Sequence, residues 1–297
     1  MENIIGLGAV GCGIAKEFSE YPEYEVYYID ARIDQENSYS LGKHTTIEEY
    51  EEAVSSTEVK KLFAKIQKQS HCMFVLGGGE NISGATLRIL REINDSPITI
   101  LYICPDGSTA SSSELWNHKI TMGILQQYAR SGLFRRMFLI SREMVEERLG
   151  DIPISLYEKS VHELISSTVS LVNYFDHVEP VMSNRSVPTD ISRIATFATS
   201  PDIDGGPYVY LYDLKGVSNI HYYYGIPMGK LENDTSIRRS IKQEIKTART
   251  SNPDVDISFS IYGTTFTDPV SIICAYSPII QEEPERSLPD GVSLPEV

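Results

Sequence analysis

The chain has 297 residues, of which 41% are hydrophobic and 23% are charged, and its formal net charge is −15. This length favours about two domains with a large core. The acidic balance argues against a protein that binds nucleic acid or an anionic membrane, because phosphate contacts require clustered lysines and arginines. No apolar run approaches the ~18 residues that a membrane-spanning helix needs.

The cysteines and histidines do not suggest a metal or redox site. The four cysteines (Cys12, Cys72, Cys104 and Cys274) are scattered and form no CxxC pair, which predicts unpaired thiols in a reducing cytoplasm. The six histidines have no ligand spacing, so we expect no zinc site. The N-terminus enters an apolar strand almost at once and leaves no room for a signal peptide, which also predicts a cytoplasmic protein.

A glycine turn follows the first predicted strand. Residues 3–7 are a short apolar strand, a glycine-rich turn and a helix at 14–20 come next, and a second strand at 25–29 ends at Asp30. This pattern satisfies G-x-G-x-x-G with an acid about 20 residues on, which is typical of a dinucleotide site. The first turn of any doubly wound α/β domain gives the same pattern, so the turn alone does not identify a ligand.

A second glycine turn follows another buried strand. Cys72–Leu76 is apolar, Gly77, Gly78 and Gly79 follow directly, and helical character begins near Ala85. Such a turn points free backbone N–H groups at an anion, although a tight turn without a ligand has a similar sequence. A dinucleotide domain needs only the first turn, so the second indicates a different kind of site.

The other elements are predicted from apolar periodicity. We expect a loop at 33–46, helices at 48–53, 58–69, 114–130 and 156–175, strands at 98–103 and 137–140, and a polar loop at 179–189. In the C-terminal part we expect strands at 208–214, 221–224, 256–262 and 270–276 around an amphipathic helix at 232–251. Alternating strands and helices favour a parallel α/β sheet in the N-terminal part.

Together these elements predict four parts. They are an α/β nucleotide-binding-type domain at 1–155, a central helix at 156–178, a smaller α+β domain at 179–280 and a disordered acidic tail at 281–297. The tail has five acids against one arginine, a composition that cannot bury a core.

In this order, several segments resemble the tubulin/FtsZ superfamily, and the resemblance covers most of the chain. Gly8–Phe18 resembles the first phosphate loop of tubulin, and the triple glycine resembles the G-G-G-T-G-[ST]-G signature. Glu114–Asn117 resembles the segment whose acid meets the ribose, and Ser160–Val172 resembles the central helix, with His162 at the guanine-reading Asn. Val187–Ala195 resembles the loop that reaches the neighbouring subunit's nucleotide. The segments SFSIYG and SIICAYS resemble two paired strands of the C-terminal domain.

The resemblance implies a site for GTP, with Mg²⁺, formed by Gly8, Gly11, Cys12, Gly77, Gly78, Gly79, Glu114, Asn117 and His162. Two departures weaken it. Glu80 and Asn81 stand where the family has Thr and Gly, and a carboxylate beside a polyphosphate costs about 1–4 kcal/mol in a partly screened site. A magnesium ion bound between the carboxylate and the polyphosphate would turn this repulsion into a net attraction.

His162 offers a different donor and acceptor geometry from Asn, which argues against guanine preference, and it is equally consistent with a residue of the core or surface.

The loop expected to support hydrolysis departs as well. Asp190 matches the first acid of the family pattern, Pro188 replaces its Asn, and Arg193 replaces the catalytic acid. An arginine cannot act as a general base because its pKa exceeds about 12, so hydrolysis is expected to be slow or absent. Alternatively, Asp190 is the N-cap of a following helix.

Three functional hypotheses remain. The first is a short tubulin/FtsZ-like cytoskeletal protein, of the size of phage and bacterial tubulins, that forms head-to-tail homo-oligomers or filaments. It would bind GTP weakly if at all, and its acidic tail would contact a partner. The second is a nucleotide-free structural or adaptor protein on the same fold. The third is an NAD-dependent oxidoreductase that uses Gly6, Gly8, Gly11 and Asp30.

Overall fold

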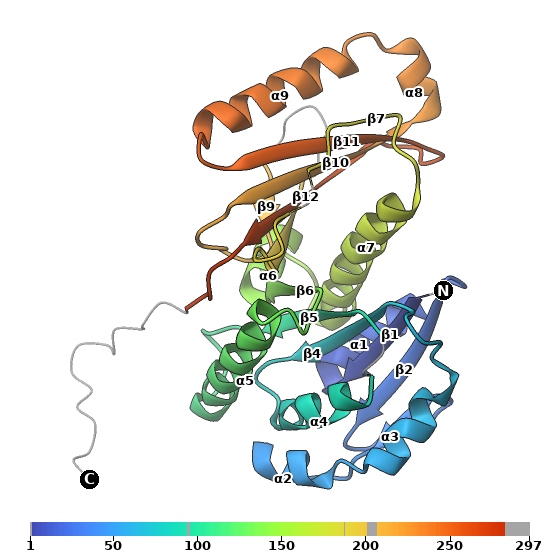
Figure 1. Ribbon diagram of the computed structural model, residues 1–297, viewed down its shortest axis with the longest axis vertical. Helices are drawn as coiled ribbons and strands as arrows, with labels where there is room; N and C mark the ends of the chain where they lie inside the picture. Colours follow the sequence, from blue (N-terminus) through green and yellow to red (C-terminus); the bar gives the residue numbers. More distant parts are fainter. Residues whose placement is uncertain (1, 94–95, 187, 201–206, 283–297) are drawn as a thin grey trace, which may run out of the picture.

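The structure is a computed structural model that describes residues 2–93, 96–186, 188–200 and 207–282 (Figure 1). In this part of the chain, twelve strands form one sheet in the order β3-β2-β1-β4-β5-β6-β8-β12-β10-β11-β7, and β9 pairs with β8. Val187 and residues 283–297 of the predicted tail lie outside the described residues.

The strands are β1 Glu2–Leu7, β2 Tyr24–Asp30, β3 Ser38–Ser40, β4 Cys72–Gly77, β5 Ile98–Cys104, β6 Arg136–Ser141, β7 Met182–Ser183, β8 Ile194–Thr199, β9 Val209–Tyr210, β10 Asn219–Pro227, β11 Asp256–Thr264 and β12 Val270–Ser277. The α-helices are α1 Gly8–Phe18, α2 Ile47–Ala53, α3 Ser56–Leu62, α4 Thr86–Leu90, α5 Ser112–Arg130, α6 Arg142–Leu149, α7 Tyr157–His177, α8 Met228–Asn233 and α9 Ile237–Ser251.

The N-terminal half is a parallel sheet with helices on both faces. Successive strand residues point to opposite faces, so Ile4 packs with α1 and α7 whereas Ile5 packs with α2, α3, α4 and α5. All residues of β4 and β5 are buried as a result. The parallel sheet is as the sequence predicts, and the order of its first six strands is that of the doubly wound dinucleotide fold.

The long helix α7 joins the two halves of the molecule. Its Phe175 stacks on Tyr223 of β10 and Tyr262 of β11, while α9 packs Ile241 and Ile245 on the other face of these strands. β8 pairs parallel with β6 and antiparallel with β12, so the sheet continues from one half into the other. The division of the chain at residue 155 stays a prediction.

Most predicted elements are confirmed within a few residues, and a few differ from the prediction. The helix expected at 232–251 is two helices, because the Asp234 carboxylate accepts hydrogen bonds from the backbone N–H and hydroxyl of Ser236 and turns the chain between α8 and α9. The strand expected at 208–214 is only Val209–Tyr210. The helix expected at 58–69 ends at Leu62. The loops expected at 33–46 and 179–189 contain the short strands β3 and β7.

Candidate functional site

The two glycine turns lie side by side in the structure. β1 and β4 are neighbouring parallel strands, with Leu7 paired with Leu76, so the turns that follow them meet at the same edge of the sheet. α1 begins at Gly8, directly after β1 and six residues earlier than predicted. Gly8 has a φ of +74°, which a residue with a side chain rarely adopts. The first turn of α1 therefore lies beside the triple-glycine turn, where a Cβ on Gly77 would lie 3.0 Å from the Cβ of Val10.

The side chain of Glu80 occupies the N-terminus of α1. Its Oε1 accepts a hydrogen bond from the backbone N–H of Ala9 at 2.8 Å. Burial raises the pKa of this carboxyl to about 7, against the opposing effect of the backbone N–H groups of Ala9 and Val10. Its Oε2 is buried and has no hydrogen-bond partner among the described residues. The carboxyl group thus stands where a helix N-terminus would bind a phosphate.

The glycines of both turns are required by packing within the chain itself. A Cβ on Gly11 would overlap the carbonyl oxygen of Val75 in β4, and one on Gly78 would overlap the hydroxyl of Tyr102 in β5. A Cβ on Gly8 would lie 2.5 Å from Oε2 of Glu80. Close approach of the chain to itself explains these glycines without a bound ligand.

The first turns of α5 hold the triple-glycine loop in place. The Asn117 Nδ2 donates to the carbonyl oxygen of Gly79 at 3.2 Å and to the Asn81 Oδ1 at 2.6 Å. The Glu114 carboxylate accepts from the backbone N–H and hydroxyl of Ser111, which completes a capping box. Both side chains predicted to meet a nucleotide lie beside the loop, and both have partners within the protein.

A buried polar pair beneath this loop was missed by the sequence analysis. The Tyr102 hydroxyl lies 2.8 Å from Nδ1 of His118, and both side chains are buried. Gly78 packs directly against both of these side chains. A single Tyr within the apolar segment ITILYIC is the signal that could have indicated a buried hydroxyl in need of a partner.

His162 packs against α1. A Cβ on Gly13 would overlap the imidazole ring, so this glycine allows α7 to approach α1 closely. Burial lowers the pKa of His162, and its nearest acid, Glu158, lies 3.8 Å away. The Cys12 thiol lies 3.4 Å from the carbonyl oxygen of Gly6, and burial raises its pKa to about 12. His162 and Cys12 are therefore packed groups beside and within α1, and Cys12 is close enough to Glu80 for that carboxyl to contribute to its raised pKa.

Asp190 and Arg193 lie at the other end of the parallel strands. Arg193 Nη1 donates to the carbonyl oxygen of Phe134 at 3.0 Å, just before β6. The glycine turns follow the C-terminal ends of the strands, about 20 Å away for strands of this length. The Asp190 side chain is 98% exposed and that of Arg193 only 18%. No helix follows Asp190, because the chain turns directly into β8, so the N-cap interpretation is wrong.

Two hollows in the described part of the chain are lined by no residue of the glycine turns. One, of 560 Å³, lies between α9 and strands β11 and β7, and another, of 240 Å³, lies beside Tyr157 and α6. The described residues contain no group of three or more His, Cys, Asp and Glu arranged to hold a metal ion. None of the helices described is long and apolar enough to cross a membrane.

Comparison with known proteins identifies the fold. No protein-family model and no curated protein sequence matches this chain. Solved structures do match. An FtsZ dimer from M. jannaschii is 13% identical, with a TM-score of 0.66 and coverage of 93% of this chain and 87% of FtsZ. A GTPγS-bound protofilament of CetZ2 from Haloferax volcanii is 14% identical, with a TM-score of 0.70 and coverage of 92% of each chain. A GTPγS-form protofilament of TubZ from Bacillus thuringiensis is 11% identical, with a TM-score of 0.65 and coverage of 94% of this chain and 87% of TubZ. The chain therefore has the fold of the tubulin/FtsZ proteins, as its motifs predict.

Proposed function

We propose that this chain is a tubulin-like cytoskeletal protein that associates head to tail, and that its own Glu80 replaces the phosphate of a bound nucleotide. The observation that carries this proposal is the buried Glu80 carboxyl on the backbone N–H of Ala9. The Glu80 carboxyl already accepts a hydrogen bond from the N-terminus of α1, so assembly does not need the phosphate of GTP at this position.

Electrostatics favours weak nucleotide binding. A phosphate at the N-terminus of α1 has to displace Glu80 or lie beside it. Above its pKa of about 7 the Glu80 carboxyl is ionised, and two unit charges ~4 Å apart then repel by about 4 kcal/mol at an effective dielectric constant of about 20. This corresponds to roughly several-hundredfold in affinity. Neither Glu114, which caps α5, nor His162, which packs on Gly13, is free to compensate.

Exposed apolar side chains at both ends of the parallel sheet support head-to-tail association. Trp116 and Ile154 are exposed near the C-terminal ends of the strands, and the Ile154 side chain is among the most exposed at 95%. Leu133 and Ile191, which is 65% exposed, precede β6 and β8 at the N-terminal ends. Two different apolar surfaces at opposite ends suit a heterologous contact, which propagates into filaments. The matching FtsZ, CetZ2 and TubZ structures are a dimer and protofilaments.

Hydrolysis is not part of the proposed function. The Arg193 guanidinium is hydrogen-bonded to a backbone carbonyl of its own chain and offers no carboxylate to position water. Asp190 is exposed at the same end, but it matches the first acid of the family pattern and not the catalytic one, which Arg193 replaces. A GTP molecule that did bind would therefore be cleaved slowly.

An adaptor that does not polymerise is the second candidate, and the same Glu80 contact favours it. The oxidoreductase hypothesis is weaker, because Asp30 Oδ1 accepts from the backbone N–H of Ala31 in its own turn. Self-association without nucleotide separates the two leading candidates.

The test is sedimentation velocity and light scattering of nucleotide-stripped protein over a range of concentrations, with and without GTP and Mg²⁺. We expect concentration-dependent association without nucleotide, weakened by Ile191→Glu and unchanged by Ile124→Glu, a matched variant of an exposed residue near the middle of α5. Assembly only with GTP would contradict the proposed role of Glu80. A monomer under every condition would favour the adaptor.

A further inference from the structure

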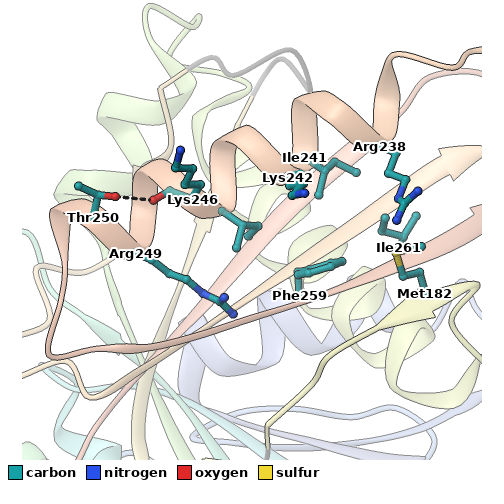
Figure 2. Close-up of a pocket in the computed structure, with 10 residues that line it drawn as sticks. Met182, Arg238, Ile241, Lys242, Lys246, Arg249, Thr250, Phe259 and Ile261 are labelled. Atoms are coloured by element: carbon teal, nitrogen blue, oxygen red, sulfur yellow. Dashed lines mark hydrogen bonds between the residues drawn. The ribbon is translucent and has the colours of Figure 1, made fainter.

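The larger hollow forms an open groove between α9 and the edge of the sheet (Figure 2). We call it the α9–β11 groove, and its lining residues are Met182, Arg238, Ile241, Lys242, Ile245, Lys246, Arg249, Thr250, Phe259 and Ile261. β7 and the residues that flank it already cover the edge of β11 as far as Phe259, because Val181 donates to the carbonyl oxygen of Ile261 and Asn184 to that of Phe259. A segment in the groove would therefore lie on side chains and would not add a strand to the sheet. The groove has room for a segment of extended chain.

The wall of the groove is strongly basic in an acidic protein. Arg238, Lys242, Lys246 and Arg249 all line it and all are exposed. No ion pair is described for any of these four within the described residues. α9 also carries a single acid, Glu244, which accepts a hydrogen bond from the Tyr224 hydroxyl at 2.9 Å. The chain as a whole has a net charge of −15, so this wall attracts acidic segments of the same protein.

The floor of the groove is apolar. Ile241 and Ile245 of α9 are buried against the sheet, whereas Phe259 is partly exposed and Met182 is 41% exposed. In Figure 2 Arg238 and Arg249 point from the helix toward the strands, whereas Lys246 points away from them, so the two arginines border the apolar floor. The Arg249 guanidinium donates a hydrogen bond to the carbonyl oxygen of Ile257 at 2.7 Å. A segment with both acidic and apolar side chains therefore fits the groove better than a purely acidic one.

We propose that the α9–β11 groove binds residues 283–297 of the same chain. This segment carries acids and apolar residues and only one cation, Arg286: its acids are Glu283, Glu285, Asp290 and Glu296, and its apolar residues include Leu288, Val292, Leu294 and Val297. Its composition matches the groove in charge and in apolar character. The segment is tethered to the protein, so its local concentration at the groove is in the millimolar range.

The described chain ends where such a segment can reach the groove. Tyr276 of β12 pairs with Asn219 of β10, which pairs with Asp256 of β11, so β12 ends at the end of the sheet where α9 ends and β11 begins. Gln281 exchanges hydrogen bonds with Gln126 of α5, and α5 and α9 pack on the same face of the sheet. Fifteen extended residues span up to about 50 Å, against about 22 Å for the length of α9.

Zero-length carbodiimide cross-linking of the full chain, followed by peptide mass spectrometry, tests this contact. The reagent joins lysine amines to carboxylates in direct contact. We expect Lys242 and Lys246 to be joined to the acids of residues 283–297, with yields that fall in 1 M salt because these exposed pairs are screened. Lys60 and Lys61 of α3, which are also exposed, serve as internal controls.

A matched pair of variants separates groove binding from general attraction. Arg238→Glu reverses a charge that lines the groove but keeps both lysines, whereas Arg239→Glu makes the same change on α9 outside the lining residues. We expect Arg238→Glu to lower the cross-link yield by about three- to tenfold and Arg239→Glu to change it much less.

Two results would overturn the proposal. The first is that α9 lysines are joined to the segment no more often than Lys60 and Lys61, or that the two variants behave alike. The second is found by mixing ¹⁵N-labelled and unlabelled protein before cross-linking. If the α9 lysines are joined only to the segment of a different copy, the groove binds residues 283–297 of a neighbouring subunit. Cross-links within one copy, sensitive to Arg238→Glu, are the expected result.

Discussion

Replacing Glu80 with Gln should stabilise the protein at neutral pH and above. Burial raises the pKa of this carboxyl from 4.5 to about 7. Between these values the folded state holds a proton that the unfolded chain has released, so the free energy of unfolding falls as the pH rises. A shift of this size corresponds to about 3 kcal/mol at 1.36 kcal/mol per pKa unit. Gln keeps the acceptor for the Ala9 N–H and cannot ionise.

Urea unfolding followed by circular dichroism measures this effect at several pH values between 4 and 8. The relevant quantity is the difference in free energy of unfolding between the Glu80→Gln variant and the natural chain, because other titrating groups cancel in it. We expect a small difference at pH 4 that grows to about 3 kcal/mol in favour of Gln by pH 8. Glu52→Gln, at an exposed position on α2, is the matched control and should show no such growth.

The opposite pH dependence would refute the claim that burial raises the pKa of Glu80. If the Glu80→Gln substitution became increasingly destabilising as the pH rises, the N-terminus of α1 would be stabilising the ionised carboxylate more than burial penalises it. A difference that does not depend on pH would mean that Glu80 is solvated in the folded protein.

Two further predictions concern the packing of the loop and the far end of the sheet. Gly78→Ala should destabilise the protein by about 1–3 kcal/mol, because its Cβ overlaps the hydroxyl oxygen and Cζ of Tyr102. Adding Tyr102→Phe removes one of the two overlapping atoms and should recover part of the loss in urea unfolding, whereas strict additivity would contradict the contact. Arg193→Asp should lower the free energy of unfolding by about 1–3 kcal/mol, because it removes the hydrogen bond to the Phe134 carbonyl. The same variant should not raise phosphate release from GTP in a malachite green assay. Asp190→Asn, at the exposed neighbour, should leave stability unchanged.

The fold was largely predictable because its signals are local. Two glycine turns after two apolar strands, a long helix with an apolar stripe and alternating strands and helices define the parallel sheet without any knowledge of contacts. α6 was missed because the segment REMVEERL is mostly charged and buries only Val145. β8 was missed because its six residues follow a polar segment that was interpreted as a loop.

The site was predictable in its residues but not in its contacts. The sequence shows that Glu80 departs from the family pattern, but its bond to the N–H of Ala9 joins groups 71 residues apart. That contact depends on the pairing of β1 with β4, which a single sequence does not reveal. The overlap of Gly13 with His162 likewise depends on the approach of α7 to α1. Tertiary packing decides these contacts, and local propensity does not.

Isothermal titration of GTP and Mg²⁺ into the natural chain and into Glu80→Ala tests the central claim most directly. If the Glu80 carboxyl replaces a phosphate at the N-terminus of α1, the natural chain should bind GTP weakly or not measurably, and Glu80→Ala should bind it at least about tenfold more tightly. Tight binding by the natural chain that is unchanged or weakened in Glu80→Ala would contradict the claim.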